Sequence, residues 1–489
     1  MGEQSHLPFP FYLCVVTVVA LAWQAWSGRT KAWGIPMLAV IGTAGVWYLG
    51  DPIYNDYGSY VRMFGADPLN AAWWEVLLFF LSLAWLVPVM NGKINQDLPN
   101  QESNIFRMMR EHSVDEGWFQ VQVDEIGKAL LIPWIVLMTL GLIRTNFDVI
   151  GIFFPYLGEK ADPWGRGRLG GGIDALYALA AYLQLMLTAV WGVVLALSKR
   201  PQTFYKAGIF YFLSAPFFVF DRTRSFILAI LLPGFMALLT LRMKSGIIFR
   251  LIVIAVSFMV LEGWMSFVIE NRDKGSIAQA FKSGGFEHVE GKKGKHLGFN
   301  MYQELGYINY FISNGTYKVN WGTRYFAEMV NPIPRVIWKN KPMIGIDYAI
   351  ARGMAYGDLN SNSGGVACSV STGMIGQGVV NFGGFLGPIA SAFLMAVWVA
   401  LLARLDLMGY RVGYLMLYGL GLVLTYNMGR DITLLILYPL IFGWILLNWY
   451  YKKKGDVQPV EGEMHSQSVI GDELSALANG KNASLNWKS

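Results

Sequence analysis

Long stretches without a charged residue limit what this chain can fold into. A helix of about 20 apolar residues spans the ~30 Å hydrocarbon core of a bilayer. Six segments that lack Asp, Glu, Lys and Arg are close to that length: 7–28, 32–50, 175–198, 381–403, 412–429 and 432–451. Each of them is predicted to form a transmembrane helix.

Five further apolar segments are predicted to cross the membrane, although they are shorter or contain charges. The segment 247–269 contains Arg250 and Glu262. The others are 76–92, 129–143, 207–220 and 225–241. We therefore predict an all-α, polytopic integral membrane protein with about 11 transmembrane helices.

The charge content agrees with a membrane protein and excludes several other classes. Charged residues make up 15% of the 489 residues, against about 25% in soluble globular proteins. The hydrophobic share of 54% excludes a disordered chain and a soluble multidomain enzyme. Many of the cations behind the net charge of +6 lie at predicted helix ends, so we expect no nucleic-acid partner. The cysteines and histidines show no metal-binding spacing, and we expect no structural metal.

The distribution of basic residues predicts the orientation of the chain. Connections on the side of the basic triplet 452–454 hold about twice as many Lys and Arg as those on the other side, and cytoplasmic loops are enriched in cations. We therefore predict that the N-terminus lies outside and the C-terminus lies in the cytoplasm.

This orientation divides the chain into four parts. Residues 1–269 carry the first eight helices, and residues 270–379 form a large periplasmic or extracellular loop. Residues 380–451 carry the last three helices, and residues 452–489 form a disordered cytoplasmic tail. The outer loop is too long to lack structure of its own, so we expect folded parts within it.

Two hairpins place charges where the outer boundary of the membrane is predicted. One is Asp221-Arg222-Thr223-Arg224, and the other is Arg430-Asp431. Charges at this depth are costly and commonly mark functional sites. Arginine forks bind phosphate oxygens bidentately, so the three arginines favour a bound diphosphate. The alternative is that each hairpin pairs its own Arg and Asp and only caps a tight turn.

The densest pattern in the outer loop is the sequence NPIPRVIWKNKP at 331–342. Its three prolines fix φ and remove backbone donors, which predicts a rigid extended path. Arg335 and Lys341 are cations on this path, and Trp338 offers a flat face for a sugar ring. The alternative is a basic interfacial loop whose tryptophan lies at headgroup level.

No residue stands out in the sequence as a general base for an acceptor hydroxyl. Glu262 lies in the outer half of a predicted span, where burial would raise its pKa, but an interhelical hydrogen bond explains it as well. The full set of candidates is Glu262, His288, His296, Glu328, Asp347 and Asp358.

Residues 334–342 read Pro-Arg-x-x-Trp-x-x-Lys-Pro and come after an Asn-Pro pair. This string resembles the signature of Wzy-type O-antigen polymerases, a family that joins oligosaccharide repeat units. The Gly-rich stretch 371–378, which runs into 381–384, resembles the segment that comes after this string in the family. Gly383 and Gly387 also have the spacing of close helix packing, which we favour over a catalytic role for them.

The arginines of both hairpins resemble family positions too, so the resemblance covers roughly residues 221–431. It implies a glycosyltransferase in the bacterial inner membrane. The outer loop contains no acidic cluster such as Asp-x-Asp, so we expect metal-independent catalysis without cofactors. The growing glycan would leave its polyprenyl diphosphate for a new lipid-linked unit at the outer leaflet. The bilayer, the polyprenyl-diphosphate-linked oligosaccharide and a chain-length regulator are the implied partners. The predicted site contains Arg335, with Glu328 or Glu262 as base, Arg222, Arg224, Arg430 and Lys341 around the diphosphate, and Trp338 on the sugar.

Two other functions stay open. An O-antigen ligase of related architecture would use the same donor with a different acceptor. A flippase of lipid-linked sugars is a third interpretation, although transporters usually show repeated halves and polar residues at the bilayer midplane. The sequence shows no internal repeat.

Overall fold

A computed structural model shows that the chain is built almost entirely from helices. It describes residues 7–98, 101–111, 117–157, 159–164, 174–221, 224–271, 300–334, 336–342, 345–356, 365–366 and 370–454. The chain forms two compact units, Met1–Trp444 and Ile445–Ser489. The described part of the second unit is the end of the last helix, and every other described element belongs to the first unit.

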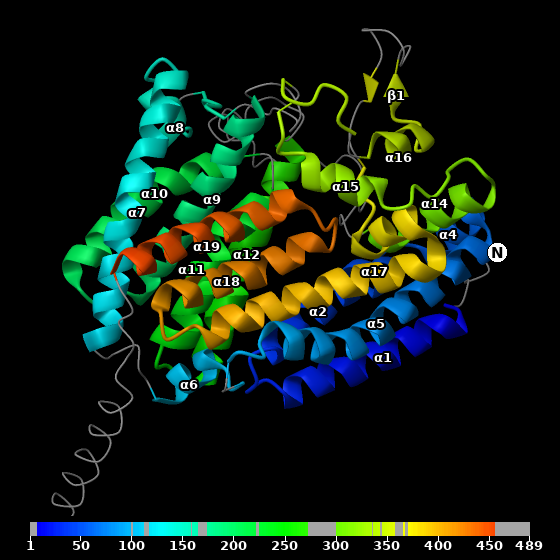
Figure 1. Cartoon of the computed structure of the whole chain (residues 1–489), viewed down its shortest axis with the longest axis horizontal. Coiled ribbons are helices and arrows are strands. Elements are labelled where there is room, and N and C mark those ends of the chain that lie inside the picture. The colour runs from blue at the N-terminus through cyan, green and yellow to red at the C-terminus, as the bar shows by residue number, and fades with distance from the viewer. Residues whose placement is uncertain are drawn as a thin grey trace, which may run out of the picture. The chain divides into compact units, whose positions relative to one another are not determined.

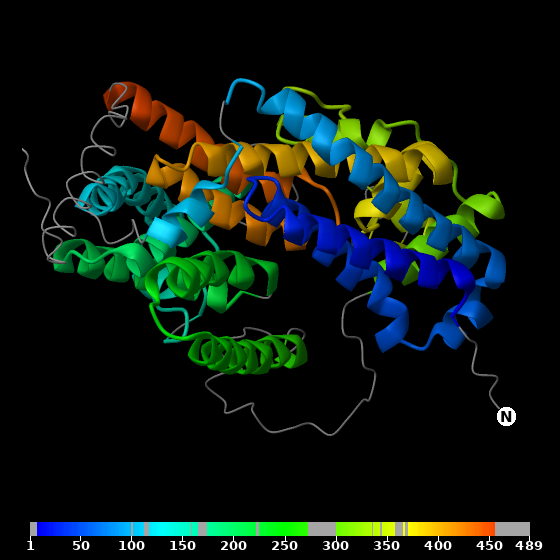
Figure 2. The ribbon, with the colours of Figure 1, turned by 90° about the horizontal axis from the view of Figure 1, so that it is seen from below.

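One group of helices is centred on α5 (Ala66–Ile94) and α17 (Met374–Leu407), which pack side by side (Figures 1 and 2). Helix α1 packs against α5 and α2. Apolar side chains such as Phe79, Phe80 and Leu83 are fully buried along α5. The other members are α1 (Phe9–Ser27), α2 (Gly34–Ala44), the π-helical turn η1 (Gly45–Leu49), α3 (Asp51–Tyr54), α4 (Tyr57–Phe64) and α14 (Met301–Ser313).

A second group surrounds α9 (Asp174–Leu197), which packs against α7, α10 and α11. Helix α18 (Val412–Met428) contacts members of both groups, and most of its side chains are buried. It therefore joins the two groups. The other members of the second group are α7 (Gly117–Arg144), α8 (Val149–Phe153), α10 (Pro201–Val219), α11 (Arg224–Ala237) and the π-helical turn η3 (Leu238–Arg242).

The segment between the two predicted blocks of spans contains folded elements of its own. Helices α15 (Thr323–Val330) and α16 (Ile346–Ala351) come after α14. The two-residue strands β1 (Ala355–Tyr356) and β2 (Gly365–Val366) pair antiparallel. The remaining helices are α6 (Asn104–Glu111), α12 (Ile247–Asn271) and α19 (Leu434–Lys454), whose last residues belong to the second unit.

The protein is a helical, multi-pass membrane protein. Among the described residues, seven helices are long and apolar enough to cross a bilayer: Phe9–Ser27, Ala66–Ile94, Gly117–Arg144, Leu179–Leu197, Ser225–Arg242, Ile247–Val268 and Met374–Leu407. A helix also occupies each of the other predicted segments, but those helices are shorter or less apolar. The total of eleven crossings and their direction stay predictions.

Helix α17 is not continuous, because its chain turns back at Gly383. This residue has φ 78° and ψ 177°, which interrupts the helix. The Ser391 hydroxyl donates to the Met374 carbonyl over 2.7 Å, whereas a straight helix would separate two residues 17 apart by about 25 Å. Gly378 and Gly387 touch backbone to backbone, since a Cβ on Gly378 would lie 2.1 Å from the Gly387 oxygen. Residues 374–382 therefore form a short arm that folds against the beginning of the long arm 384–407.

This fold-back changes the interpretation of Gly383 and Gly387, whose spacing was expected to let two helices pack closely. Gly387 does pack closely, but its partner is Gly378 of the short arm. Gly383 supplies the left-handed backbone at the break, a conformation that a side chain disfavours. The predicted span that begins at 381 starts at the end of the short arm, so the continuous helix begins after Gly383.

Candidate functional site

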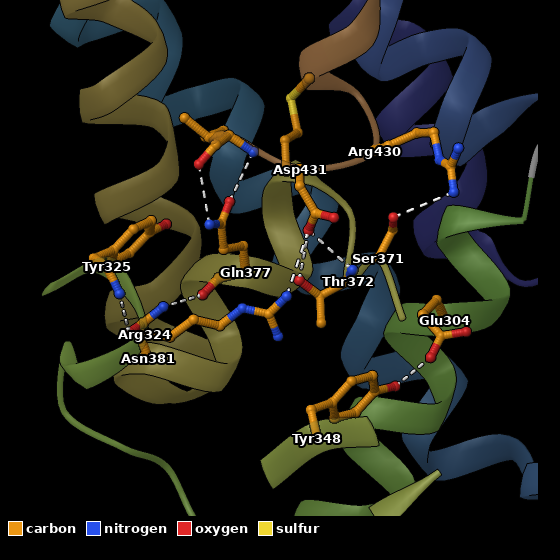
Figure 3. A network of polar contacts seen from close by, with 12 residues as sticks. Glu304, Arg324, Tyr325, Tyr348, Ser371, Thr372, Gln377, Asn381, Arg430 and Asp431 are labelled. Carbon is orange, nitrogen blue, oxygen red and sulfur yellow. Dashed lines mark hydrogen bonds and ion pairs between the residues drawn. The ribbon is translucent and has the colours of Figure 1, made fainter. Parts of the chain in front are cut away.

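Three segments far apart in the sequence meet at one polar cluster (Figure 3). Arg324 comes from α15, Thr372 precedes the short arm of α17, and Asp431 lies in the turn between α18 and α19. We call this group, together with Glu328 and Arg430, the α15 cluster. Two of its members, Glu328 and Arg430, are predicted site residues.

The turn between α18 and α19 is fastened to the beginning of α17. Asp431 Oδ1 accepts hydrogen bonds from the backbone N and the Oγ1 of Thr372, each over 3.0 Å. The Arg430 carbonyl accepts from Gly373 N over 2.7 Å, and the Arg430 guanidinium donates to Ser371 Oγ over 3.3 Å. Asp431 is therefore held in place by its hydrogen bonds to Thr372. The alternative interpretation of this hairpin instead expects Asp431 to pair locally with Arg430.

The short arm of α17 connects this turn to α15. Gln377 forms two hydrogen bonds with the backbone of Ile432, donating over 3.1 Å and accepting over 2.8 Å. Asn381 donates to the Gln377 carbonyl over 2.7 Å and accepts from Tyr325 N over 3.4 Å. The Tyr325 ring stacks on Phe382. The fold-back at Gly383 thus brings α15 and the turn to one place.

Arg324 is a buried cation with unused donors. Its side chain is 5% exposed, and Nη2 lies 3.8 Å from Asp431 Oδ1. Gly345, at φ 64°, lets the backbone approach the guanidinium, because a Cβ there would lie 3.3 Å from Nη2. Within the described residues, Nε and Nη1 have no hydrogen-bond partner. Buried donors of a charged group are nearly always paired, so these two atoms are candidates for contact with a ligand.

Glu328 lies one helical turn after Arg324, so both side chains lie on the same face of α15. It is 6% exposed, and its Oε2 has no hydrogen-bond partner among the described residues. Burial, and then the charge of Asp431, raises the pKa of the Glu328 carboxyl to about 7, while Arg324 opposes the shift. Such a carboxyl can take up or release a proton near neutral pH.

The α15 cluster therefore combines two chemical capacities. Arg324 and the exposed Arg430 can neutralise an anion, and Glu328 can act as a base. Stabilisation of developing negative charge by fixed donors is often the largest single contribution to enzyme catalysis. In the part of the chain that the structure describes, no three His, Cys, Asp or Glu side chains gather to hold a metal ion.

The first predicted hairpin is described only in part. Arg222 lies outside the described residues, and Arg224 begins α11 with a side chain that is also outside them. Asp221 pairs with Lys160 over 2.5 Å, and Lys160 also lies over the Phe217 ring. The position of the two arginines relative to the α15 cluster stays a prediction.

The proline-rich loop differs from its prediction. Residues 331–332, 336–337 and 339–340 lie in turns and not on an extended path, since Ile333 N donates to the Val330 carbonyl and Ile337 N to the Pro334 carbonyl. A proline φ near −65° suits turns as well as extended chain, and its carbonyl still accepts hydrogen bonds. Arg335, the predicted catalytic residue of this loop, lies outside the described residues.

Two other residues of this loop contact the loop itself or the neighbouring helix α15. Lys341 is buried, and its Nζ donates to the carbonyls of Asn331 and Ile333 over 2.6 and 2.7 Å. Trp338 is half-buried and meets Phe326 edge to face at 6.2 Å. These contacts favour a role for both in holding the loop together over direct contact with substrate.

Two of the remaining base candidates are described, and both are exposed. Glu262 is exposed on α12 and not buried as predicted, because α12 packs against the other helices mainly near Trp264 and Phe267. Asp347 is exposed and accepts from Tyr317 Oη over 2.6 Å. His288, His296 and Asp358 lie outside the described residues.

Arg324 and Asp431 were not predicted as ligand-binding residues from the sequence. The sequence feature that could have drawn attention to Arg324 is its spacing. Arg324 and Glu328 are four residues apart in a short amphipathic segment of the outer loop. The contact with Asp431 depends on long-range folding and leaves no local pattern. Comparisons with protein-family models, curated proteins and solved structures find no significant match to this chain.

Proposed function

We propose that the protein is a polymerase of lipid-linked oligosaccharide repeat units, such as those of O-antigen, capsule or exopolysaccharide. The observation that carries the proposal is the buried, incompletely paired Arg324 beside Glu328 and Asp431. A cation with open donors suits the diphosphate leaving group of a polyprenyl-linked glycan, and Glu328 suits an acceptor hydroxyl. The resemblance of residues 334–342 to the polymerase family supports the same function.

The proposed reaction forms one glycosidic bond and breaks one glycosyl phosphate bond. The acceptor hydroxyl oxygen attacks the anomeric carbon of the growing glycan, and its proton passes to Glu328. The bond from that carbon to the diphosphate oxygen breaks, and the polyprenyl diphosphate leaves with the electron pair. Arg324 and Arg430 neutralise the charge that develops on the diphosphate.

The proposed arrangement has eleven crossings of the bacterial inner membrane, with the N-terminus outside. Contacts between connections support it, because connections predicted on one side touch one another. On the outer side, Asp51 accepts from Gln303 N over 2.8 Å, and Arg324 lies near Asp431. On the inner side, Arg404 pairs with Asp97 over 2.7 Å.

Deletion of the gene in its host, followed by sizing of the surface glycan, tests the function. A polymerase predicts that long chains disappear while single repeat units still reach the surface. Long chains that are made but not attached to their acceptor would contradict the proposal and indicate a ligase. Lipid-linked units that accumulate inside cells without surface glycan would indicate a flippase.

The same assay links the function to the cluster. An Arg324→Ala chain supplied to the deletion strain should leave single units and no long chains. A matched Lys318→Ala chain, which removes an exposed cation from the same outer segment, should restore the wild-type length distribution. Full-length glycan from the Arg324→Ala chain would separate polymerisation from this cluster.

A further inference from the structure

A groove of about 610 Å³ lies between the end of α9, the beginning of α10 and the end of α11. Gly192 of α9 and Gly234 of α11 line it, and α9 and α11 touch backbone to backbone there. A Cβ on Gly234 would lie 2.8 Å from the Gly192 oxygen. The residues of the α15 cluster take no part in this groove.

The walls of the groove are mostly apolar. Phe204 of α10 contributes an aromatic side chain that is 45% exposed. Aliphatic and aromatic groups continue the surface on the neighbouring helices, namely Leu195, Leu231, Phe235 and Leu238. A wall of this kind suits a hydrocarbon chain and offers little to a water-soluble metabolite.

One end of the groove is cationic. Lys199 lies just after the end of α9, and Arg242 ends the π-helical turn η3. Tyr205, which is 68% exposed, lines the same end. Lys199 comes seven positions after Gly192 along the chain, so the apolar floor extends about 10 Å from the cations.

We propose that this groove binds one phospholipid with an anionic headgroup. The phosphate lies at Lys199 and Arg242, and an acyl chain lies along the apolar walls. Charge complementarity decides the headgroup, because two cations at one end favour a net negative lipid over a zwitterionic one. The basic residues of the chain predict that this end faces the cytoplasmic leaflet.

Native mass spectrometry of the purified full chain tests the site. Delipidated protein is titrated with phosphatidylglycerol and, separately, with phosphatidylethanolamine. The wild type should bind phosphatidylglycerol more tightly. The double variant Lys199→Gln/Arg242→Gln should lose about 30-fold in affinity for it, as expected for two cations at an anionic headgroup.

A matched double variant separates this site from general attraction to charge. Lys206→Gln/Lys244→Gln removes two exposed cations near the same end that do not line the groove. Its affinity for phosphatidylglycerol should stay within about twofold of the wild type. An equal loss in both double variants, or no preference for phosphatidylglycerol in the wild type, would overturn the proposal.

A steric variant tests the acyl chain and does not depend on the charged residues. Ala196→Phe adds a ring to the groove lining without changing any charge. It should lower phosphatidylglycerol binding, whereas glycerol 3-phosphate at the same concentration should not displace the lipid. Unchanged lipid binding by this variant, or displacement by glycerol 3-phosphate, would show that the groove does not hold a lipid chain.

Discussion

Two buried clusters of Arg and Glu lie in the outer segment of the chain, and they differ in how well their polar atoms are paired. In the first, Glu304 accepts from Arg352 Nε over 2.9 Å and from the Tyr348 hydroxyl. Arg352 also lies over the Tyr307 ring at 3.5 Å. In the second, the α15 cluster, Arg324 keeps two unpaired nitrogens and Glu328 one unpaired oxygen among the described residues.

The difference shows how the same residue types serve two purposes. The contacts of Glu304 and Arg352 join α14 to the end of α16, and a pair so well satisfied has little capacity for a ligand. The α15 cluster is held at its edges by Thr372, Gln377 and Asn381, while Nε and Nη1 of Arg324 have no partner in the part of the chain that the structure describes. We therefore expect the first cluster to control stability and the second to control activity.

The largest expected effect is on the rate of polymer formation by Arg324→Ala. Removing a fixed donor from a developing anion commonly costs about 100-fold to 1,000-fold in rate. We expect a loss of this size in proteoliposomes that contain a lipid-linked donor and acceptor. The thermal unfolding temperature should change little, because Nε and Nη1 of Arg324 have no hydrogen-bond partner among the described residues and its contact with Asp431 is long, at 3.8 Å.

The matched variant Arg352→Ala should show the opposite pattern. It leaves Glu304 buried with one partner fewer, and breaking a buried pair typically costs about 3–5 kcal/mol. Its unfolding temperature should fall by several degrees, while the protein that stays folded should keep a rate near that of the wild type. If both variants lost stability and rate in the same proportion, the distinction between the clusters would fail.

The next effect is the pH dependence given by Glu328. A base must be ionised, so a pKa of about 7 predicts that the rate rises roughly tenfold from pH 6 to pH 8. Glu328→Gln should lower the rate at pH 8 by about 100-fold and remove this rise. A pH–rate profile of the Gln variant that still rises through pH 7 would assign the base to another residue.

Glu328→Gln should also change stability with a defined sign. Folding raises the pKa of this carboxyl from 4.5 to about 7, so its contribution to stability is fully present below pH 4.5 and is lost as the pH rises through 7. Glutamine does not ionise, so the stability of the variant does not fall in this way as the pH rises. Above pH 8 the variant should therefore be more stable than the wild type, by up to about 3 kcal/mol, as measured by chemical unfolding at several pH values.

A smaller effect is expected at Arg430. This residue is exposed and donates one long hydrogen bond to Ser371, so its charge is partly screened by water. Arg430→Ala should lower the polymerisation rate by about tenfold, and Arg430→Lys should restore part of it. Equal losses in Arg430→Ala and Arg324→Ala would mean that burial does not distinguish the two arginines.

The smallest effect should come from Trp338. Its edge-to-face contact with Phe326 suggests that Trp338→Ala loosens the loop and lowers stability by about 1 kcal/mol, with a rate change below threefold. If Trp338 instead stacks on a sugar ring, Trp338→Ala should raise the acceptor concentration that gives half of the maximal rate, and Trp338→Phe should not. Acceptor titrations of both variants decide between these roles.

The sequence predicted the helical membrane fold well because each apolar segment is a local property. A helix occupies every predicted segment, including the short one at 207–220. The fold-back at Gly383 was missed because no charged residue marks a break on either side of it. The change of direction depends on one backbone conformation and on the contact between Gly378 and Gly387.

The candidate site could be predicted only in part. Arg430 and Glu328 were selected from their predicted depth and from proximity to the proline-rich loop. Lys341 was selected for its charge. The sequence does not show which groups its amine contacts, and in the structure the amine donates to two carbonyls of the loop. Arg324 stands out only when burial and missing partners are known.

Binding of undecaprenyl diphosphate to the purified protein is the most direct test, because it needs no knowledge of the sugar. The leaving group should bind to the wild type and to Arg352→Ala with affinities within about twofold of each other. Arg324→Ala should bind it at least about tenfold more weakly, since it lacks the buried guanidinium. Equal affinity of the wild type and Arg324→Ala for this lipid would contradict the assignment of the α15 cluster as the diphosphate site.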